Sequence, residues 1–99
     1  MLDKLCCADF VTLVGESFQV QLEGLTPIPL RLVSATETGT PRAPDQRPPF
    51  SLIFLGPESQ QYLRQGTYPL EHERMHGLEL FLVPLGPQAG RMQYEAIFT

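Results

Sequence analysis

The chain has 99 residues, of which 42% are hydrophobic, so it can bury one core without a metal or a disulfide and has no room for a second domain. Eleven acidic residues against seven basic ones give a formal net charge of −4, and Lys4 is the only lysine. We therefore expect one β-domain spanning residues 1–99, without the basic stripe that binds nucleic acids or anionic membranes.

The first residues contain two adjacent cysteines, Cys6 and Cys7, and lack the apolar stretch of a secretory signal. Neighbouring cysteines do not reach disulfide geometry without strain, so we interpret them as small thiols that are buried or half-buried. No later segment approaches the ~20 apolar residues of a membrane helix. We expect cytoplasmic synthesis and no membrane insertion, and we leave the final location open.

Apolar residues recur at helical spacing over residues 10–14, which predicts one short helix with Asp9 as its N-cap and Gly15 as its end. Residues 17–22 and 28–32 then alternate apolar and polar side chains, the pattern of strands with one wet face. The two segments should form a hairpin. Because proline cannot donate to a ladder, Pro29 indicates that the second strand lies at an edge or begins irregularly.

Residues 34–49 show no apolar periodicity and contain four prolines, which remove backbone donors where a ladder would form. We predict a proline-rich loop over this range. Connections of more than about 12–15 residues are uncommon in compact domains and are often functional, so this loop is a candidate binding element. The alternative is a tolerated flexible insertion.

The second half of the chain contains further strand patterns. Residues 50–55 and 78–85 are apolar at nearly every position, which is typical of central strands covered on both faces. Residues 67–72 and 91–99 alternate, and the last segment should pair with residues 78–85. The fold class predicted is all-β: a small antiparallel barrel or sandwich of about six strands with one short N-terminal helix.

The phase of these strands predicts a core and a second apolar face. The predicted core residues are Phe18, Val20, Leu30, Leu32, Leu52, Phe54, Tyr68, Leu80, Leu82, Tyr94 and Phe98. The candidate interaction surface on the second face consists of Ile53, Leu55, Phe81, Val83 and Ile97. This face needs a cover, either the predicted helix or another chain, and the strand over residues 91–99 should offer a free edge.

Five motifs stand out in the second half. They are Phe50-Ser-Leu-Ile-Phe-Leu-Gly-Pro, Leu63-Arg-Gln-Gly-Thr-Tyr, Leu70-Glu-His, Leu80-Phe-Leu-Val-Pro-Leu-Gly-Pro and Tyr94-Glu-Ala-Ile-Phe. With these motifs the chain resembles an uncharacterised family of short bacterial β-rich domains, and it departs from that family at His76, where glycine is preferred. The resemblance implies a β-rich fold, no assigned activity, and an association with gene clusters for phage-tail-collar or tail-fibre-like proteins.

The segment His72-Glu73-Arg74-Met75-His76 matches H-E-x-x-H, in which a helix places two histidines on one face to bind zinc. Pro69 and Gly77 flank it, and the neighbouring residues alternate as in a strand. We therefore expect an extended segment and a turn here, and no metal site. A zinc hydrolase is kept only as a remote alternative.

These observations predict a non-enzymatic structural or assembly module. We expect it to act through its β-surface, either by forming a homo-oligomer or by docking to another protein of the tail-fibre-like class. The alternative is a small protein- or ligand-binding module that uses the loop over residues 34–49. No catalytic residue, cofactor site or phosphate-binding loop is predicted.

Overall fold

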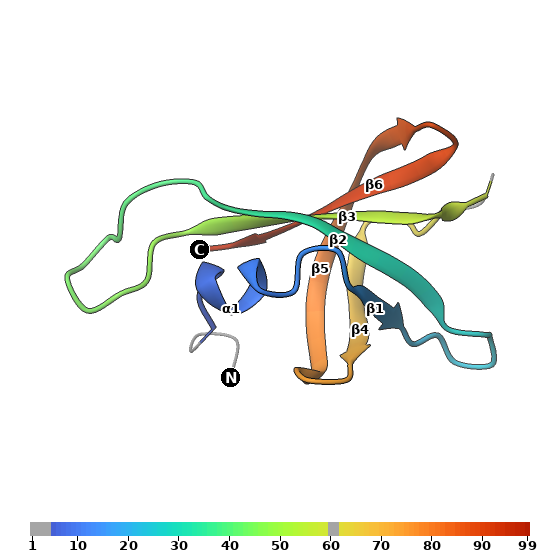
Figure 1. Ribbon diagram of the computed structural model, residues 1–99, viewed down its shortest axis with the longest axis horizontal. Coiled ribbons are helices and arrows are strands. Elements are labelled where there is room, and N and C mark those ends of the chain that lie inside the picture. The colour runs from blue at the N-terminus through green and yellow to red at the C-terminus, as the bar shows by residue number, and fades with distance from the viewer. Residues whose placement is uncertain (1–4, 60–61) are drawn as a thin grey trace.

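The computed structural model describes residues 5–59 and 62–99, and in these residues one short helix and six strands form a closed antiparallel barrel (Figure 1). The elements are α1 (Cys7–Val11), β1 (Ser17–Val20), β2 (Ile28–Glu37), β3 (Phe50–Glu58), β4 (Gly66–His72), β5 (His76–Gln88) and β6 (Arg91–Phe98). The order around the barrel is β1-β2-β3-β6-β5-β4. The predicted all-β fold with an N-terminal helix is confirmed, and it is a barrel and not a sandwich.

Helix α1 begins earlier than the sequence predicted, at Cys7 instead of Phe10. The N-cap is Cys6, whose backbone N–H donates to the Asp9 carboxylate at 2.8 Å. Asp9 thus stabilises the helix start from within the first turn, where a carboxylate satisfies a free N–H group and interacts well with the helix dipole. Within the described residues, no helix is both long enough and apolar enough to cross a membrane.

The short helix closes one end of the barrel. The Phe10 ring centroid lies 5.8 Å from that of Phe50 and 5.5 Å from that of Phe98. Phe50 and Phe98 in turn stack on each other with centroids 4.4 Å apart. In Figure 1 α1 lies beside the C-terminal end of β6. The helix therefore adds to the interior and does not cover the outer apolar face.

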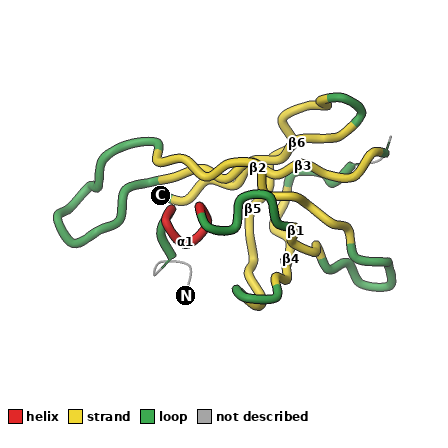
Figure 2. Tube along the Cα trace, in the orientation of Figure 1, coloured by secondary structure: helices red, strands yellow, loops and turns green. Residues whose placement is uncertain are grey.

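Strand β2 continues five residues past the predicted end at Leu32. Its last residues pair with β3 through Ala35 opposite Leu52 and Glu37 opposite Phe50. The side chains of this segment are mostly polar, so the apolar alternation does not extend over it. Its backbone nevertheless pairs with β3. The loop therefore spans residues 38–49 and not 34–49, and it projects from one end of the molecule (Figure 2).

Closure of the barrel corrects two further expectations about strand edges. Pro29 lies near the start of β2, which pairs with β1 on one side and with β3 on the other, although Pro29 itself has a register partner only on β1, Gln19. The barrel closes through β1 and β4, where Gln19 lies opposite Glu71 and Val20 opposite Leu70. Strand β6 is likewise flanked by β3 and β5. Neither strand is the edge that the sequence predicted, because closure removes sheet edges.

Ten of the eleven predicted core side chains are buried, and Tyr68 is half-buried. The Tyr68 hydroxyl reaches the surface and donates to the Arg64 carbonyl oxygen at 2.6 Å. The core also contains buried residues that the prediction did not include: Cys7, Phe10, Leu13, Phe50, Leu63, Leu70 and Ala96. Several of these come from α1 and from the strand ends that α1 covers.

Candidate interaction surface

The predicted second apolar face lies on the outside of the barrel. Along β3, Leu52 and Phe54 are fully buried, whereas Ile53 and Leu55 alternate with them and are half-buried. The exposed fraction is 51% for Phe81 and 60% for Ile97. These side chains therefore point away from the core, as the alternation predicts.

The register brings the predicted surface residues together. Ile53 on β3 and Val83 on β5 both lie opposite Glu95 on β6, one from each side. Phe81 and Ile97 line the same hollow of about 320 Å³. We call the set Ile53, Leu55, Phe81, Val83 and Ile97 the outer patch. Because registered partners on neighbouring strands share a sheet face, it is one surface across β3, β6 and β5.

Two features of this surface were missed from the sequence. Val33, which is 43% exposed, lies at a β2 bulge next to the pair formed by Ser34 and Ile53. Glu95 carries a carboxylate into the middle of the outer patch, and the Ser51 hydroxyl donates to its Oε2 at 2.7 Å. The alternation of β6 places Glu95 on the same face as Ile97, and this was the signal available.

The H-E-x-x-H segment forms a β-hairpin. His72 ends β4 and lies opposite His76, the first residue of β5, so the expected extended segment and turn are confirmed. The side chain of His76 lies outside the described ones. Within residues 5–59 and 62–99, no group of three or more His, Cys, Asp or Glu residues is placed to hold a metal ion.

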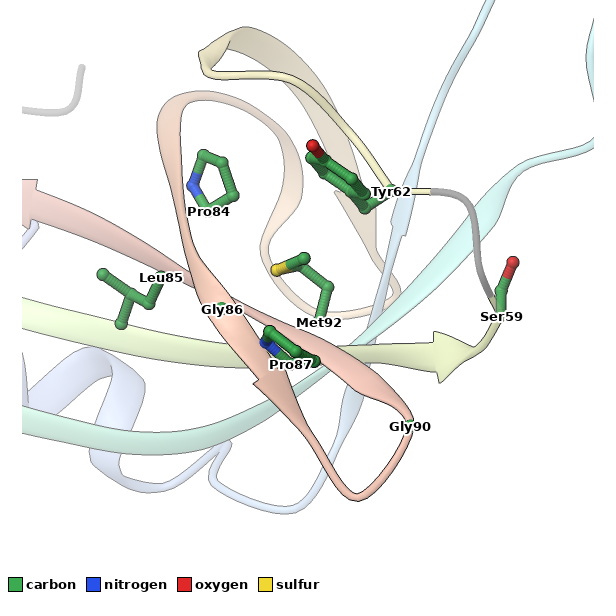
Figure 3. Close-up of a pocket in the computed structure, with 8 residues that line it drawn as sticks. All are labelled: Ser59, Tyr62, Pro84, Leu85, Gly86, Pro87, Gly90 and Met92. Atoms are coloured by element: carbon green, nitrogen blue, oxygen red, sulfur yellow. The ribbon is translucent and has the colours of Figure 1, made fainter.

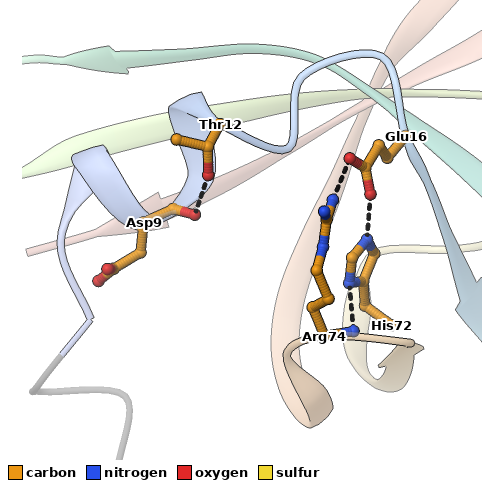
Figure 4. A network of polar contacts seen from close by, with 5 residues as sticks. All are labelled: Asp9, Thr12, Glu16, His72 and Arg74. Atoms are coloured by element: carbon orange, nitrogen blue, oxygen red, sulfur yellow. Dashed lines mark hydrogen bonds and ion pairs between the residues drawn. The ribbon is translucent and has the colours of Figure 1, made fainter.

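His72 instead belongs to a polar network that fastens the hairpin to the start of β1 (Figure 4). Its Nε2 lies 2.9 Å from Oε1 of Glu16, and its Nδ1 accepts the Arg74 backbone N–H at 3.0 Å. The Glu16 carboxylate also binds the Arg74 guanidinium. The His72 ring packs on Phe18 with centroids 4.6 Å apart. The Nδ1 hydrogen bond thus shapes the hairpin turn, and the Nε2 contact ties the hairpin to the residue before β1.

This network predicts an acid-dependent loss of stability. Hydrogen bonds from Arg74 and then from His72 hold the pKa of Glu16 below its ordinary value of 4.5. A lowered folded-state pKa stabilises the fold above the unfolded-state pKa, and this contribution is lost as the pH falls through the folded-state value. The stability difference between wild type and Glu16→Gln should therefore shrink as the pH falls below 4.5, measured by urea unfolding at each pH.

The matched control for this measurement is Glu23→Gln, because Glu23 is an exposed glutamate in the connection between β1 and β2. Its substitution should leave the pH profile of wild type unchanged. An equal profile for Glu16→Gln and wild type would contradict the stabilising role of the network.

The two cysteines contribute to the closed end of the barrel. Cys7 is buried, Cys6 is partly exposed, and both thiols are free. Burial, followed by the nearby Glu37 charge, raises the pKa of Cys7 above its ordinary value. The interpretation of these residues as buried or half-buried thiols is confirmed, and Cys7 is protected as a neutral core side chain.

The loop over residues 38–49 is anchored at its base. The Thr38 backbone N–H donates to the Pro49 carbonyl oxygen at 2.8 Å. Arg47 donates to the carbonyl oxygens of Leu5 and Thr99, and its guanidinium carbon lies 5.5 Å from the Phe50 ring centroid. Arg47 therefore spans the end of the barrel that α1 closes.

A second hollow of about 620 Å³ lies between the end of β5, the start of β6 and the chain around Ser59 and Tyr62 (Figure 3). Its lining residues are Ser59, Tyr62, Pro84, Leu85, Gly86, Pro87, Gly90 and Met92. Among them only Ser59 and Tyr62 have polar side chains, and none is charged. The described lining therefore offers no acid–base pair for catalysis.

Comparison with known protein families gives a match over nearly the whole chain. A family model described as "Domain of unknown function (DUF6916)" matches residues 5–98. This range includes α1 and every strand of the barrel. No curated protein and no solved structure matches the chain.

Proposed function

We propose that this chain, which belongs to the DUF6916 family of domains of unknown function, is a non-enzymatic assembly module. It binds other proteins through its outer patch. The observation that carries this proposal is the exposure of Phe81 and Ile97, which line one hollow on the outside of the barrel. Contiguous apolar surface of this kind marks protein interaction sites, because covering it removes apolar area from water.

Contact between faces fits this barrel better than strand addition. In the closed order every strand has a neighbour on each side, so backbone groups open to a partner strand are confined to strand ends such as β2 after Leu32 and β5 after Leu82, whose registers run along one neighbour only. The outer patch, in contrast, spans three adjacent strands, and α1 packs at the barrel end instead of over it. The proposed partner is a second copy of the chain or a tail-fibre-like protein, the class that the sequence resemblance implies.

Ile97→Lys is expected to abolish association while changing the free energy of unfolding by less than about 1 kcal/mol. The side chain is 60% exposed, so lysine is tolerated in the free domain, whereas an ammonium group buried in an apolar contact is costly. Sedimentation velocity across a concentration series measures the association. Leu25→Lys is the control, because Leu25 is 68% exposed but lies outside the outer patch.

The proposal fails if wild type sediments only as an 11.1 kDa species and co-purification with the products of neighbouring genes recovers nothing. A partner that binds wild type and Ile97→Lys equally well would place the site elsewhere. The anchored loop over residues 38–49 is then the binding element. Its tip is a turn in which the Gln46 backbone N–H donates to the Ala43 carbonyl oxygen at 3.0 Å.

A further inference from the structure

Two opposite charges flank the part of the outer patch formed by Ile53 and Leu55. Glu95 lies on β6 opposite Ile53, and Arg31 lies on β2 opposite Leu55. Because β3 runs between β2 and β6, the two charges lie diagonally across Ile53 and Leu55. The Arg31 side chain is exposed and, within the described residues, its guanidinium has no hydrogen-bond or ion-pair partner.

The carboxylate of Glu95 limits what can cover this surface. Its Oε2 accepts the Ser51 hydroxyl, and in the described part of the chain no cation pairs with it. A purely apolar partner would bury this charge without compensation, which is unfavourable. A surface that fits must therefore bring a cation to Glu95 and an anion to Arg31, with apolar groups between them.

The chain itself presents this combination. In a two-fold dimer the same patch meets itself, so each residue on one side of the axis faces a residue from the other side. Consider a two-fold axis that lies in the interface plane and crosses the line from Arg31 to Glu95 at its midpoint and at a right angle. This axis brings the Arg31 of each copy over the Glu95 of the other copy. Ile53 and Leu55 then lie near the axis and contact their counterparts.

Resting on the assembly function proposed above, we infer that a second copy of this chain covers the outer patch face to face. Arg31 of each copy pairs with Glu95 of the other copy, around a centre formed by Ile53 and Leu55. The arginine fork matches the geometry of a carboxylate, and the charges set the mutual orientation of the two barrels.

A charge-swap experiment tests this arrangement. Arg31→Glu alone and Glu95→Arg alone should each raise the dimer Kd at least about tenfold, because each places like charges together. The double variant restores opposite charges and should return the Kd to within about threefold of wild type. Sedimentation equilibrium measures Kd, and Arg64→Glu, an exposed arginine outside the outer patch, should behave as wild type.

Glu95→Gln guards against a folding defect in Glu95→Arg. Glutamine can still accept the Ser51 hydroxyl, so this variant should keep the thermal unfolding midpoint of wild type while it weakens the dimer and reduces its sensitivity to salt. An unchanged Kd and salt dependence in Glu95→Gln would contradict the ion pair.

The outcomes separate this inference from the function on which it rests. If Ile97→Lys dissociates the dimer but the double charge swap does not restore affinity lost in the single variants, the pairing is wrong and the outer patch remains an assembly surface. If the chain is monomeric but a different protein binds the outer patch, the inference that a second copy covers this patch is wrong. If neither association occurs, the proposed function itself fails.

Discussion

Replacing Phe54 with alanine is expected to lower the free energy of unfolding by about 3–5 kcal/mol, the range for removing a buried phenylalanine ring. Phe54 is fully buried in β3, and its ring meets that of Phe18 edge-on with centroids 5.5 Å apart. Its register partners are Leu32 on β2 and Tyr94 on β6, so the lost ring leaves a cavity bounded by several strands. Chemical denaturation of both proteins measures the difference.

The control for Phe54→Ala is Tyr62→Ala, which removes an aromatic ring that is 58% exposed. This substitution should change the free energy of unfolding by less than about 1 kcal/mol. A loss below about 1 kcal/mol for Phe54→Ala as well would contradict the central position of β3 in the core.

Tyr94→Phe is expected to lower the free energy of unfolding by about 1–3 kcal/mol, although it removes only one oxygen atom. The Tyr94 hydroxyl oxygen accepts the backbone N–H of Leu63 at 2.8 Å in a buried environment. Phenylalanine keeps the ring and leaves that N–H group without its acceptor, which is the more costly way to lose a hydrogen bond. Chemical denaturation near neutral pH measures this loss.

The same side chain predicts a difference at alkaline pH. Burial is the main cause that raises the pKa of Tyr94 above its ordinary value of 10.0. The unfolded state therefore loses its proton first, so this residue's contribution to stability is present below pH 10 and declines above it. Tyr94→Phe should lack this part of the alkaline loss.

Tyr68→Phe is the matched control for the measurement near neutral pH. Its hydroxyl donates to the Arg64 carbonyl oxygen at an exposed position, where water can replace it. The expected loss is below about 1 kcal/mol. Equal losses for the two tyrosine variants would contradict the special role of the buried N–H group of Leu63.

Local periodicity was sufficient to predict most of the strands and both of their faces. In a strand, successive side chains point to opposite sides, so the pattern of β3 separates buried Phe54 from outward Ile53 without knowledge of the partner strands. For the same reason the five residues of the outer patch could be named from the sequence. The phase of each strand is a property of neighbouring residues, and the sequence contains it directly.

The pattern was insufficient where side chains were polar or segments short. The sequence pattern predicts the end of β2 at Leu32, because residues 34–37 carry few apolar groups. Their backbone nevertheless pairs with β3. The start of α1 was misplaced because Asp9 stabilises the helix from its first turn and not as the N-cap. In both cases backbone hydrogen bonds define the element, and side-chain hydrophobicity reports them only indirectly.

The sequence by itself therefore determined the strand phases, the core side chains and the existence of a second apolar face. Only the tertiary structure decided that the sheet closes, that α1 fills its end, and that His72 bonds to Glu16, which is 56 residues away. It also placed Arg31 and Glu95 on either side of β3. The physical reason is that strand order and register depend on contacts between segments that are distant in the sequence. Such contacts form only when the whole barrel packs, and they produce no periodic pattern within a single segment.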